Sequence, residues 1–148
     1  MKLLVINGPN LNMLGIRERE IYGERDYAAL CRYIEDAAAA LGAEVELFQS
    51  NHEGAIVDRI QAAYFDGTEG IVINPAAYTH TSVAILDALK AVRLPAVEVH
   101  LSDVDAREPF RRVSYAGMAC VARFAGLGFE GYKRAMAYLT KGAGSNAL

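Results

Sequence analysis

Residues Ile71–Val83 read IVINPAAYTHTSV, and this stretch decides the fold. It begins with a β-branched apolar run that is typical of a buried strand. Pro75 has no N–H to donate to a continuing sheet, so the sequence predicts that the strand ends at Asn74. Polar side chains follow from Tyr78 to Ser82, and they lead into a helical pattern formed by Ile85, Leu86, Leu89 and Val92. A strand, a polar turn and a helix make up half of a βαβ unit.

Asn74 and His80 follow the carboxyl end of this predicted strand. In open α/β sheets, ligands bind outside the carboxyl ends of the strands, so both side chains are candidates to contact a ligand. The alternative is that they only cap the helix that follows. Spacing alone leaves both interpretations open.

The rest of the chain alternates between strand and helix patterns in the same way. Right-handed crossovers between five parallel strands give a three-layer α/β sandwich, for which we expect the flavodoxin-like strand order 2-1-3-4-5. A length of 148 residues suits a single domain over 1–148. In this strand order the loops that carry Asn10, Asn74 and His80 converge. The other predicted strands are Leu3–Ile6, Val45–Phe48, Ala96–Val99 and Met118–Ala122.

Three further helices are predicted from their ends and their apolar spacing. Asp26 is expected to cap the start of the first, and Gly42 to follow its end. Ser50 and Glu53 have the spacing of a capping box for the second. The last is expected over Phe129–Leu139.

The lid loop, which we define as residues 11–25, follows the first predicted strand. It is long for a compact domain, and glycines near both ends suit a hinge. We therefore expect a functional lid, with a solvated surface loop as the alternative.

Composition excludes several classes of partner. The net charge of −3 gives no basic surface for nucleic acid, and 53% hydrophobic residues suffice for a full core. No apolar run approaches the roughly 20 residues that span a bilayer, and no secretory cleavage site follows the N-terminus. We expect a cytoplasmic protein with no nucleic-acid or membrane partner.

Familiar site motifs are missing from the chain. It has neither the GxGxxG of dinucleotide sites nor the GxxxxGK[ST] of P-loops, and no GxSxG elbow. Three scattered histidines without paired cysteines make a poor zinc site, and no lysine follows a predicted strand. We therefore expect no metal and no cofactor.

The remaining polar residues suit acid–base chemistry on a small polyhydroxylated anion. Glu98 and His100 lie two apart at the end of the fourth strand, so alternation places them on one face. Arginine can clamp a carboxylate, and asparagine and serine can bind hydroxyls. Arg17 and Tyr22 share the lid loop, where a close arginine could lower the pKa of a tyrosine enough for it to act as a base.

Five ordered motifs resemble the type II dehydroquinases, the type II 3-dehydroquinate dehydratases of the shikimate pathway, which makes aromatic amino acids. The resemblance spans nearly the whole chain, and one departure is Arg19, where the family's lid usually has proline. The motifs are NGPNLNMLG (7–15), Arg17 with Tyr22-Gly23, SNHEG (50–54), INPAAYTHTSVA (73–84) and EVHLSDVDAREPFR (98–111).

The resemblance implies an anti elimination of water from 3-dehydroquinate through an enolate, without metal or cofactor. Tyr22 would be the base, activated by Arg17, and His100 would protonate the departing hydroxyl. Glu98 would orient His100, and Asn10 would help to hold a water on the enolate oxygen. The substrate would be bound by Asn74, His80, Leu101, Ser102 and Arg111.

Asp87 is a special case within the same resemblance. At about 100° per residue it points away from the apolar face of its helix, which predicts a solvated aspartate. The family instead places this residue in the active site of a neighbouring subunit, within trimers that assemble into a homododecamer. The runner-up function is a non-catalytic flavodoxin-like module that binds a small polyol or a nucleotide.

Overall fold

A parallel sheet forms the centre of the molecule in the computed structural model, which describes residues 1–16 and 25–141. Within these residues the strand order is β2-β1-β3-β4-β5, so the predicted flavodoxin-like order is confirmed. Pro75 ends β3 at Asn74 as expected, and β4 extends to His100. The strands are β1 Lys2–Asn7, β2 Glu44–Gln49, β3 Gly70–Asn74, β4 Ala96–His100 and β5 Ala122–Ala125.

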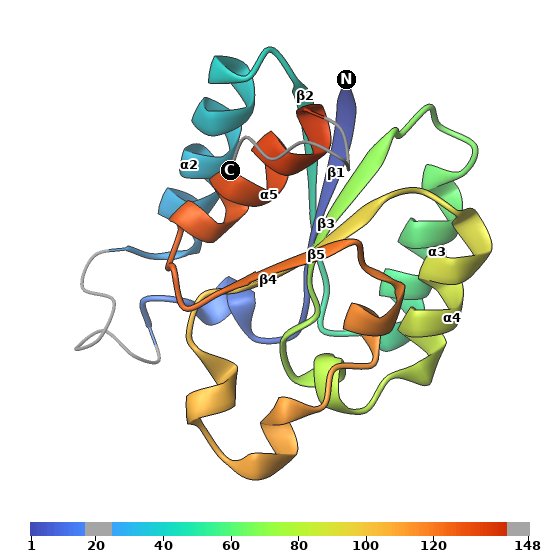
Figure 1. The fold of residues 1–148 in the computed structure, drawn as a ribbon. Coiled ribbons are helices and arrows are strands. Elements are labelled where there is room, and N and C mark those ends of the chain that lie inside the picture. The colour runs from blue at the N-terminus through green and yellow to red at the C-terminus, as the bar shows by residue number, and fades with distance from the viewer. Residues whose placement is uncertain (17–24, 142–148) are drawn as a thin grey trace.

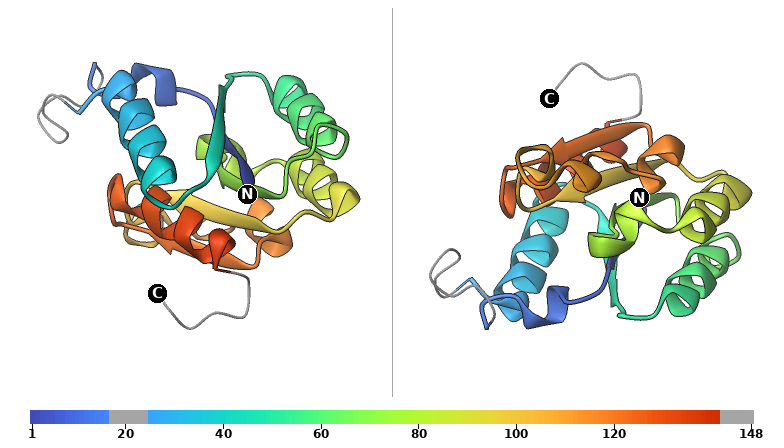
Figure 2. Two further views of the ribbon diagram at one scale, coloured as in Figure 1. Left: turned by 90° about the horizontal axis from the view of Figure 1, so that it is seen from above. Right: turned by 90° about the horizontal axis from the view of Figure 1, so that it is seen from below.

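Helices cover both faces of this sheet and complete three layers. Figures 1 and 2 show α2 (Tyr27–Ala40) and α5 (Glu130–Thr140) on one face, with α3 (Glu53–Ala63) and α4 (Val83–Val92) on the other. Because side chains alternate along a strand, β1 contributes to both apolar layers. Leu3 and Val5 join the layer under α2 and α5, and Leu4 and Ile6 join the layer under α3 and α4. Each such fully buried side chain stabilises the fold by about 1.5–3 kcal/mol.

The ends of α2 form as the sequence predicts, and the start of α3 does not. The Asp26 carboxylate accepts a 2.8 Å hydrogen bond from the N–H of Ala29, and Gly42 after the helix has a φ of 71°. The capping box of Ser50 and Glu53 is wrong, because α3 begins at Glu53 and His52 is its N-cap residue. The N–H of Ser50 still donates to the carbonyl of Asn7 at 3.1 Å, so the chain has not yet left the sheet at that residue.

The fifth strand lies later in the chain than predicted. Residues Ala116–Ala119 form a short 3-10 helix, and β5 begins at Ala122, which pairs with Val97 of β4. The apolar run 118–121 misled the prediction, since Ala119 and Cys120 pack against the layer under α3 and α4. β5 is an edge strand with partly exposed side chains, so it lacks a continuous apolar sequence.

The carboxyl ends of β1, β3 and β4 lie at one edge of the sheet, and short 3-10 helices follow them. Gly8 joins two of these loops, because its N–H donates to the carbonyl of Asn74 at 2.8 Å. A Cβ at position 8 would lie 2.5 Å from the carbonyl oxygen of Pro75, so only glycine permits this approach. The 3-10 helices at this edge are Leu11–Met13, Ala76–His80, Val104–Ala106 and Pro109–Arg112. No helix in the described part of the chain is long and apolar enough to cross a membrane.

Candidate active site

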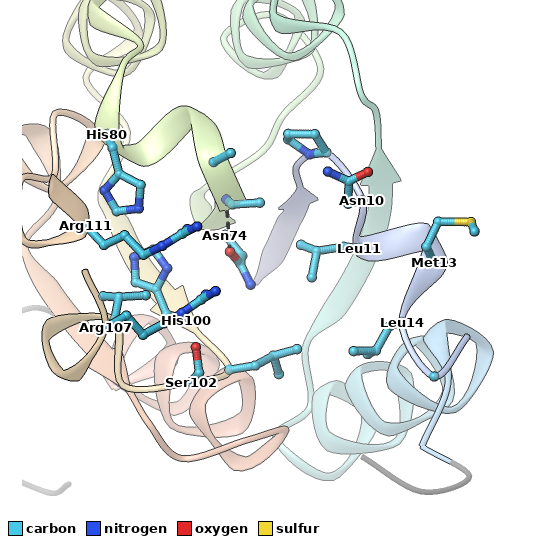
Figure 3. Close-up of a pocket in the computed structure, with 16 residues that line it drawn as sticks. Asn10, Leu11, Met13, Leu14, Asn74, His80, His100, Ser102, Arg107 and Arg111 are labelled. Atoms are coloured by element: carbon cyan, nitrogen blue, oxygen red, sulfur yellow. Dashed lines mark hydrogen bonds between the residues drawn. The ribbon is translucent and has the colours of Figure 1, made fainter. Parts of the chain in front are cut away.

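A cavity of about 350 Å³ opens at this edge of the sheet, between the loops that follow β1, β3 and β4. Its size suits a small metabolite. Figure 3 shows polar side chains from these three loops turned toward one another across the cavity. The predicted site residues that line it are Asn10, Asn74, His80, His100, Leu101, Ser102 and Arg111.

His100 is held against Glu98 on the same face of β4, as alternation predicts. Its Nε2 donates to Oε2 of Glu98 over 2.6 Å, and both side chains are buried. An ionised carboxylate only accepts hydrogen bonds, so the hydrogen sits on Nε2 and Nδ1 is left to exchange a proton with a ligand. Glu98 thus lies behind His100 and fixes the orientation of its ring.

The carboxylate of Glu98 has two further partners, which sequence reasoning missed. The hydroxyl of Ser114 donates to Oε2 over 2.6 Å, and Nε of Arg123 lies 3.5 Å from Oε1. Burial raises the pKa of Glu98, but hydrogen bonds from His100 and Ser114 and the nearby positive charge of Arg123 outweigh it, so the pKa is lowered overall. Glu98 is therefore charged at neutral pH, as the orientation of His100 requires.

His80 presents one defined ring nitrogen toward the cavity. Its Nδ1 donates to the carbonyl of Val113 over 2.8 Å, which leaves Nε2 as an acceptor in the neutral ring. The ring also lies edge-on to Phe110, with the two centroids 6.5 Å apart. His80 is therefore oriented to bind a hydroxyl, and its part in capping α4 is taken by Ser82, whose hydroxyl accepts from the N–H of Ile85.

Asn10 is positioned by a contact that the sequence did not reveal. Its backbone is left-handed, with a φ of 70°, a conformation that asparagine tolerates better than most residues. Its N–H donates to Oδ1 of Asn51 over 3.0 Å, and the carbonyl of Asn51 accepts from the hydroxyl of Tyr78 over 2.7 Å. Asn51 belongs to the SNHEG motif, so this motif links the loops after β1 and β3.

Two arginines give the cavity a positive wall. Arg111 was predicted, and its Nε lies 2.6 Å from Oε2 of Glu108. Arg107 also lines the cavity and was not singled out, although it stands within the motif 98–111. Guanidinium groups suit a carboxylate or another anion.

Four predicted site residues are not among those that line the cavity, and one of them, Glu98, lies behind His100. Asp87 is exposed on α4 and does not line it, as the helical pattern indicated. Arg17 and Tyr22 lie outside the described residues. Their places in the site remain predictions.

Fold and cavity together define a class of protein, a flavodoxin-like α/β enzyme with acid–base groups and an anion-binding wall at the carboxyl edge of its sheet. The model of the family described as Dehydroquinase class II matches residues 1–140. The chain belongs to this family, which confirms the resemblance of its motifs.

Relatives and solved structures agree with this membership. The 3-dehydroquinate dehydratase of Clostridium acetobutylicum is 55% identical over 132 residues, which are 89% of this chain and 91% of the relative. The 3-dehydroquinate dehydratase of Lachnospira eligens is 56% identical over 137 residues, which are 92% of this chain and 93% of the relative. The crystal structure of a type II dehydroquinase from Butyrivibrio crossotus has a TM-score of 0.90 at 54% identity and covers 94% of this chain and 97% of its own.

Proposed function

We propose that this chain catalyses the loss of water from 3-dehydroquinate, which gives 3-dehydroshikimate. The reaction is a hydro-lyase step of the shikimate pathway. The observation that carries the proposal is the buried pair of Glu98 and His100 at the wall of a cavity with two arginines. A proton donor beside an anion-binding wall is what the dehydration of a small hydroxy acid needs.

The elimination follows from the roles that the family motifs give to five residues. Tyr22, with its pKa lowered by Arg17, takes the proton on the carbon next to the ketone, and the ketone oxygen becomes an enolate oxygen. Asn10 helps to hold a water that stabilises this oxygen. The enolate electrons then form the new double bond as the C–O bond on the opposite face breaks. His100, oriented by Glu98, gives a proton to the departing hydroxyl, and water leaves.

Substrate binding in this proposal uses the other polar residues of the cavity. Arg111, Ser102 and the backbone of Leu101 hold the carboxylate and hydroxyls from the loops after β4. Asn74, at the end of β3, and His80, in the 3-10 helix that follows, also hold the carboxylate and hydroxyls. The carbonyl of Val113 already orients the His80 ring.

The proposal also includes a homo-oligomeric assembly of this chain. We place the chain in a homododecamer of trimers, in which Asp87 reaches into the site of a neighbouring subunit. Asp87 is exposed on α4 and does not line the cavity of its own subunit, and both observations support this role. A cytoplasmic location, where aromatic amino acids enter protein synthesis, belongs to the same proposal.

The direct test is to mix the purified chain with 3-dehydroquinate and follow the enone absorbance of the product. We expect turnover by the wild type and its loss in His100→Ala. His52→Ala is the matched control, because His52 is exposed and its side chain makes no capping bond to α3. A wild type that binds 3-dehydroquinate without forming an enone would favour the non-catalytic module.

A second test separates this elimination from imine and metal chemistry. No lysine lines the cavity, and the described residues contain no cluster of three or more histidine, cysteine or acidic side chains that could hold a metal. Activity should therefore survive both EDTA and borohydride added with substrate. A borohydride adduct that inactivates the enzyme would contradict the proposed mechanism.

A further inference from the structure

A buried tyrosine connects the ends of two strands beneath the cavity. Tyr132, in the first turn of α5, is fully buried, and its hydroxyl lies 2.6 Å from Oδ1 of Asn7 and 3.0 Å from Nδ2 of Asn74. Asn7 and Asn74 are the last residues of β1 and β3, and they pair with each other in the sheet. The three side chains therefore form one hydrogen-bonded group from elements far apart in the chain.

The direction of these hydrogen bonds follows from one backbone group. The N–H of Ala76 can only donate, so the atom of Asn74 that faces it at 3.1 Å must be the oxygen. The nitrogen of Asn74 then faces Tyr132, whose oxygen must accept from it. The single phenol proton is thereby directed to Asn7, which must present its own oxygen.

The other hydrogen bond of the Asn7 side chain agrees with these directions. Its Nδ2 is left to donate, and the hydroxyl of Tyr27 lies 3.5 Å away to accept. Burial raises the pKa of Tyr132 above its ordinary value, and the hydrogen bond from Asn74 offsets only part of this rise. Because the phenol keeps its proton at neutral pH, the direction of the hydrogen bonds does not reverse there.

Asn74 forms part of the cavity wall, as Figure 3 shows. Its amide oxygen is engaged by Ala76, and one N–H is engaged by Tyr132. The second N–H has no partner among the hydrogen bonds of the described residues. This N–H is the group that the amide can offer to a ligand.

We propose that Tyr132 is a positioning residue that locks the amide of Asn74 with an N–H donor toward the cavity. The substrate group that binds at Asn74 must then be a hydrogen-bond acceptor, such as a carboxylate oxygen. This inference rests on the proposed function, because the substrate is the one named there. Without Tyr132 only the N–H of Ala76 holds the amide. The amide can then turn over more readily and present its oxygen, which repels a carboxylate.

The first experiment measures the kinetics of Tyr132→Phe with 3-dehydroquinate. The phenyl ring keeps the packing of α5, and only the oxygen is lost. We expect KM to rise about tenfold while kcat stays within about threefold, because ground-state and transition-state binding are weakened alike. Leu139→Val is the control, since Leu139 is buried on the same helix and has no hydrogen bond to Asn74. Its KM should equal that of the wild type.

A double-mutant cycle then asks whether Tyr132 acts through Asn74. In the background of Asn74→Ala, the change Tyr132→Phe should leave KM unaltered, because there is no amide left to position. A tenfold rise in both backgrounds would show a general structural effect and would overturn the proposal. So would a folded Tyr132→Phe enzyme whose KM stays within twofold of the wild type.

Asn7→Leu tests the direction of the hydrogen bonds with Tyr132 and Asn74 both intact. Removing the acceptor frees the phenol proton, which can then donate to the oxygen of a turned Asn74 amide, so KM should again rise severalfold. An unchanged KM in this variant would contradict the proposed directions of these hydrogen bonds. Absence of turnover by the wild type would contradict the proposed function instead, and the same cycle measured on the Kd of 3-dehydroquinate would still decide the role of Tyr132.

Discussion

Glu98 and His100 form a buried hydrogen-bonded pair on β4, with 2.6 Å between Oε2 and Nε2 and exposed fractions of 1% and 3%. The carboxylate is held in turn by Ser114, whose hydroxyl also accepts from the N–H of Gly117 over 2.9 Å. The orientation of His100 thus depends on a chain of contacts that ends at the backbone of Gly117. Any group that displaces Glu98 should release the imidazole.

Gly117→Ala is expected to lower kcat by about tenfold, because it displaces Glu98. An added Cβ would lie 2.6 Å from Oε1 of Glu98 and 2.8 Å from the hydroxyl oxygen of Ser114, closer than carbon and oxygen can approach. Steady-state kinetics with 3-dehydroquinate provide the measurement. Both oxygens belong to side chains, so the fold itself should survive.

Gly54→Ala is the matched control for this substitution. A Cβ at Gly54 meets nothing within 4 Å, and the residue lies inside α3. We expect an unchanged kcat and a stability gain of about 0.5–1 kcal/mol from helix propensity. A Gly117→Ala enzyme with the kcat of the wild type would show that His100 does not depend on this contact.

The lowered pKa of Glu98 predicts a pH-dependent contribution to stability. A carboxyl group with a lower pKa in the folded state stabilises the fold above its unfolded pKa, whose ordinary value is 4.5, and this contribution is lost as pH falls through the folded pKa. The difference in unfolding free energy between the wild type and Glu98→Gln should therefore shrink between about pH 6 and about pH 3. Urea unfolding at both pH values measures it, and an equal difference at both would contradict the lowered pKa.

Tyr22→Phe should abolish turnover while the Kd of 3-dehydroquinate stays within roughly tenfold, since the hydroxyl is needed mainly in the transition state. Arg17→Ala should behave alike, because the base would lose the charge that lowers its pKa. Tyr64→Phe is the control, as Tyr64 is 63% exposed and does not line the cavity. If Tyr22→Phe kept most of its kcat, the base would have to be another residue.

Features set by neighbouring residues could be predicted from the sequence. Pro75 ends β3 after Asn74, and strand alternation places Glu98 and His100 on one face. Apolar runs covered by helices gave β1 and β3, but β5 was misplaced because an edge strand carries only a weak pattern.

Contacts between distant residues could not be predicted in this way. Ser114 reaches Glu98 across 16 positions, and Tyr132 reaches Asn7 across 125. Both side chains have ordinary surroundings in the sequence, since a tyrosine on the apolar face of α5 indicates only core packing. Their roles arise from the strand order, which brings the ends of β1, β3 and β4 together.

Asp87 provides the test of the proposed assembly. Asp87→Ala removes an exposed carboxylate from α4 that does not line the cavity of its own subunit, so an isolated subunit should be indifferent to the change. In the proposed trimer the same carboxylate orients polar groups around the neighbour's substrate, and its loss should lower kcat/KM by about tenfold or more. Lys90→Ala is the control, because Lys90 is likewise exposed on α4 and its loss should leave kcat/KM unchanged.

Sedimentation of both variants and the wild type gives the oligomeric state, which should be the same large homo-oligomer for all three. A wild-type monomer with full activity would contradict both the assembly and the role of Asp87, because a carboxylate on the outside of one subunit can reach a substrate only across an interface.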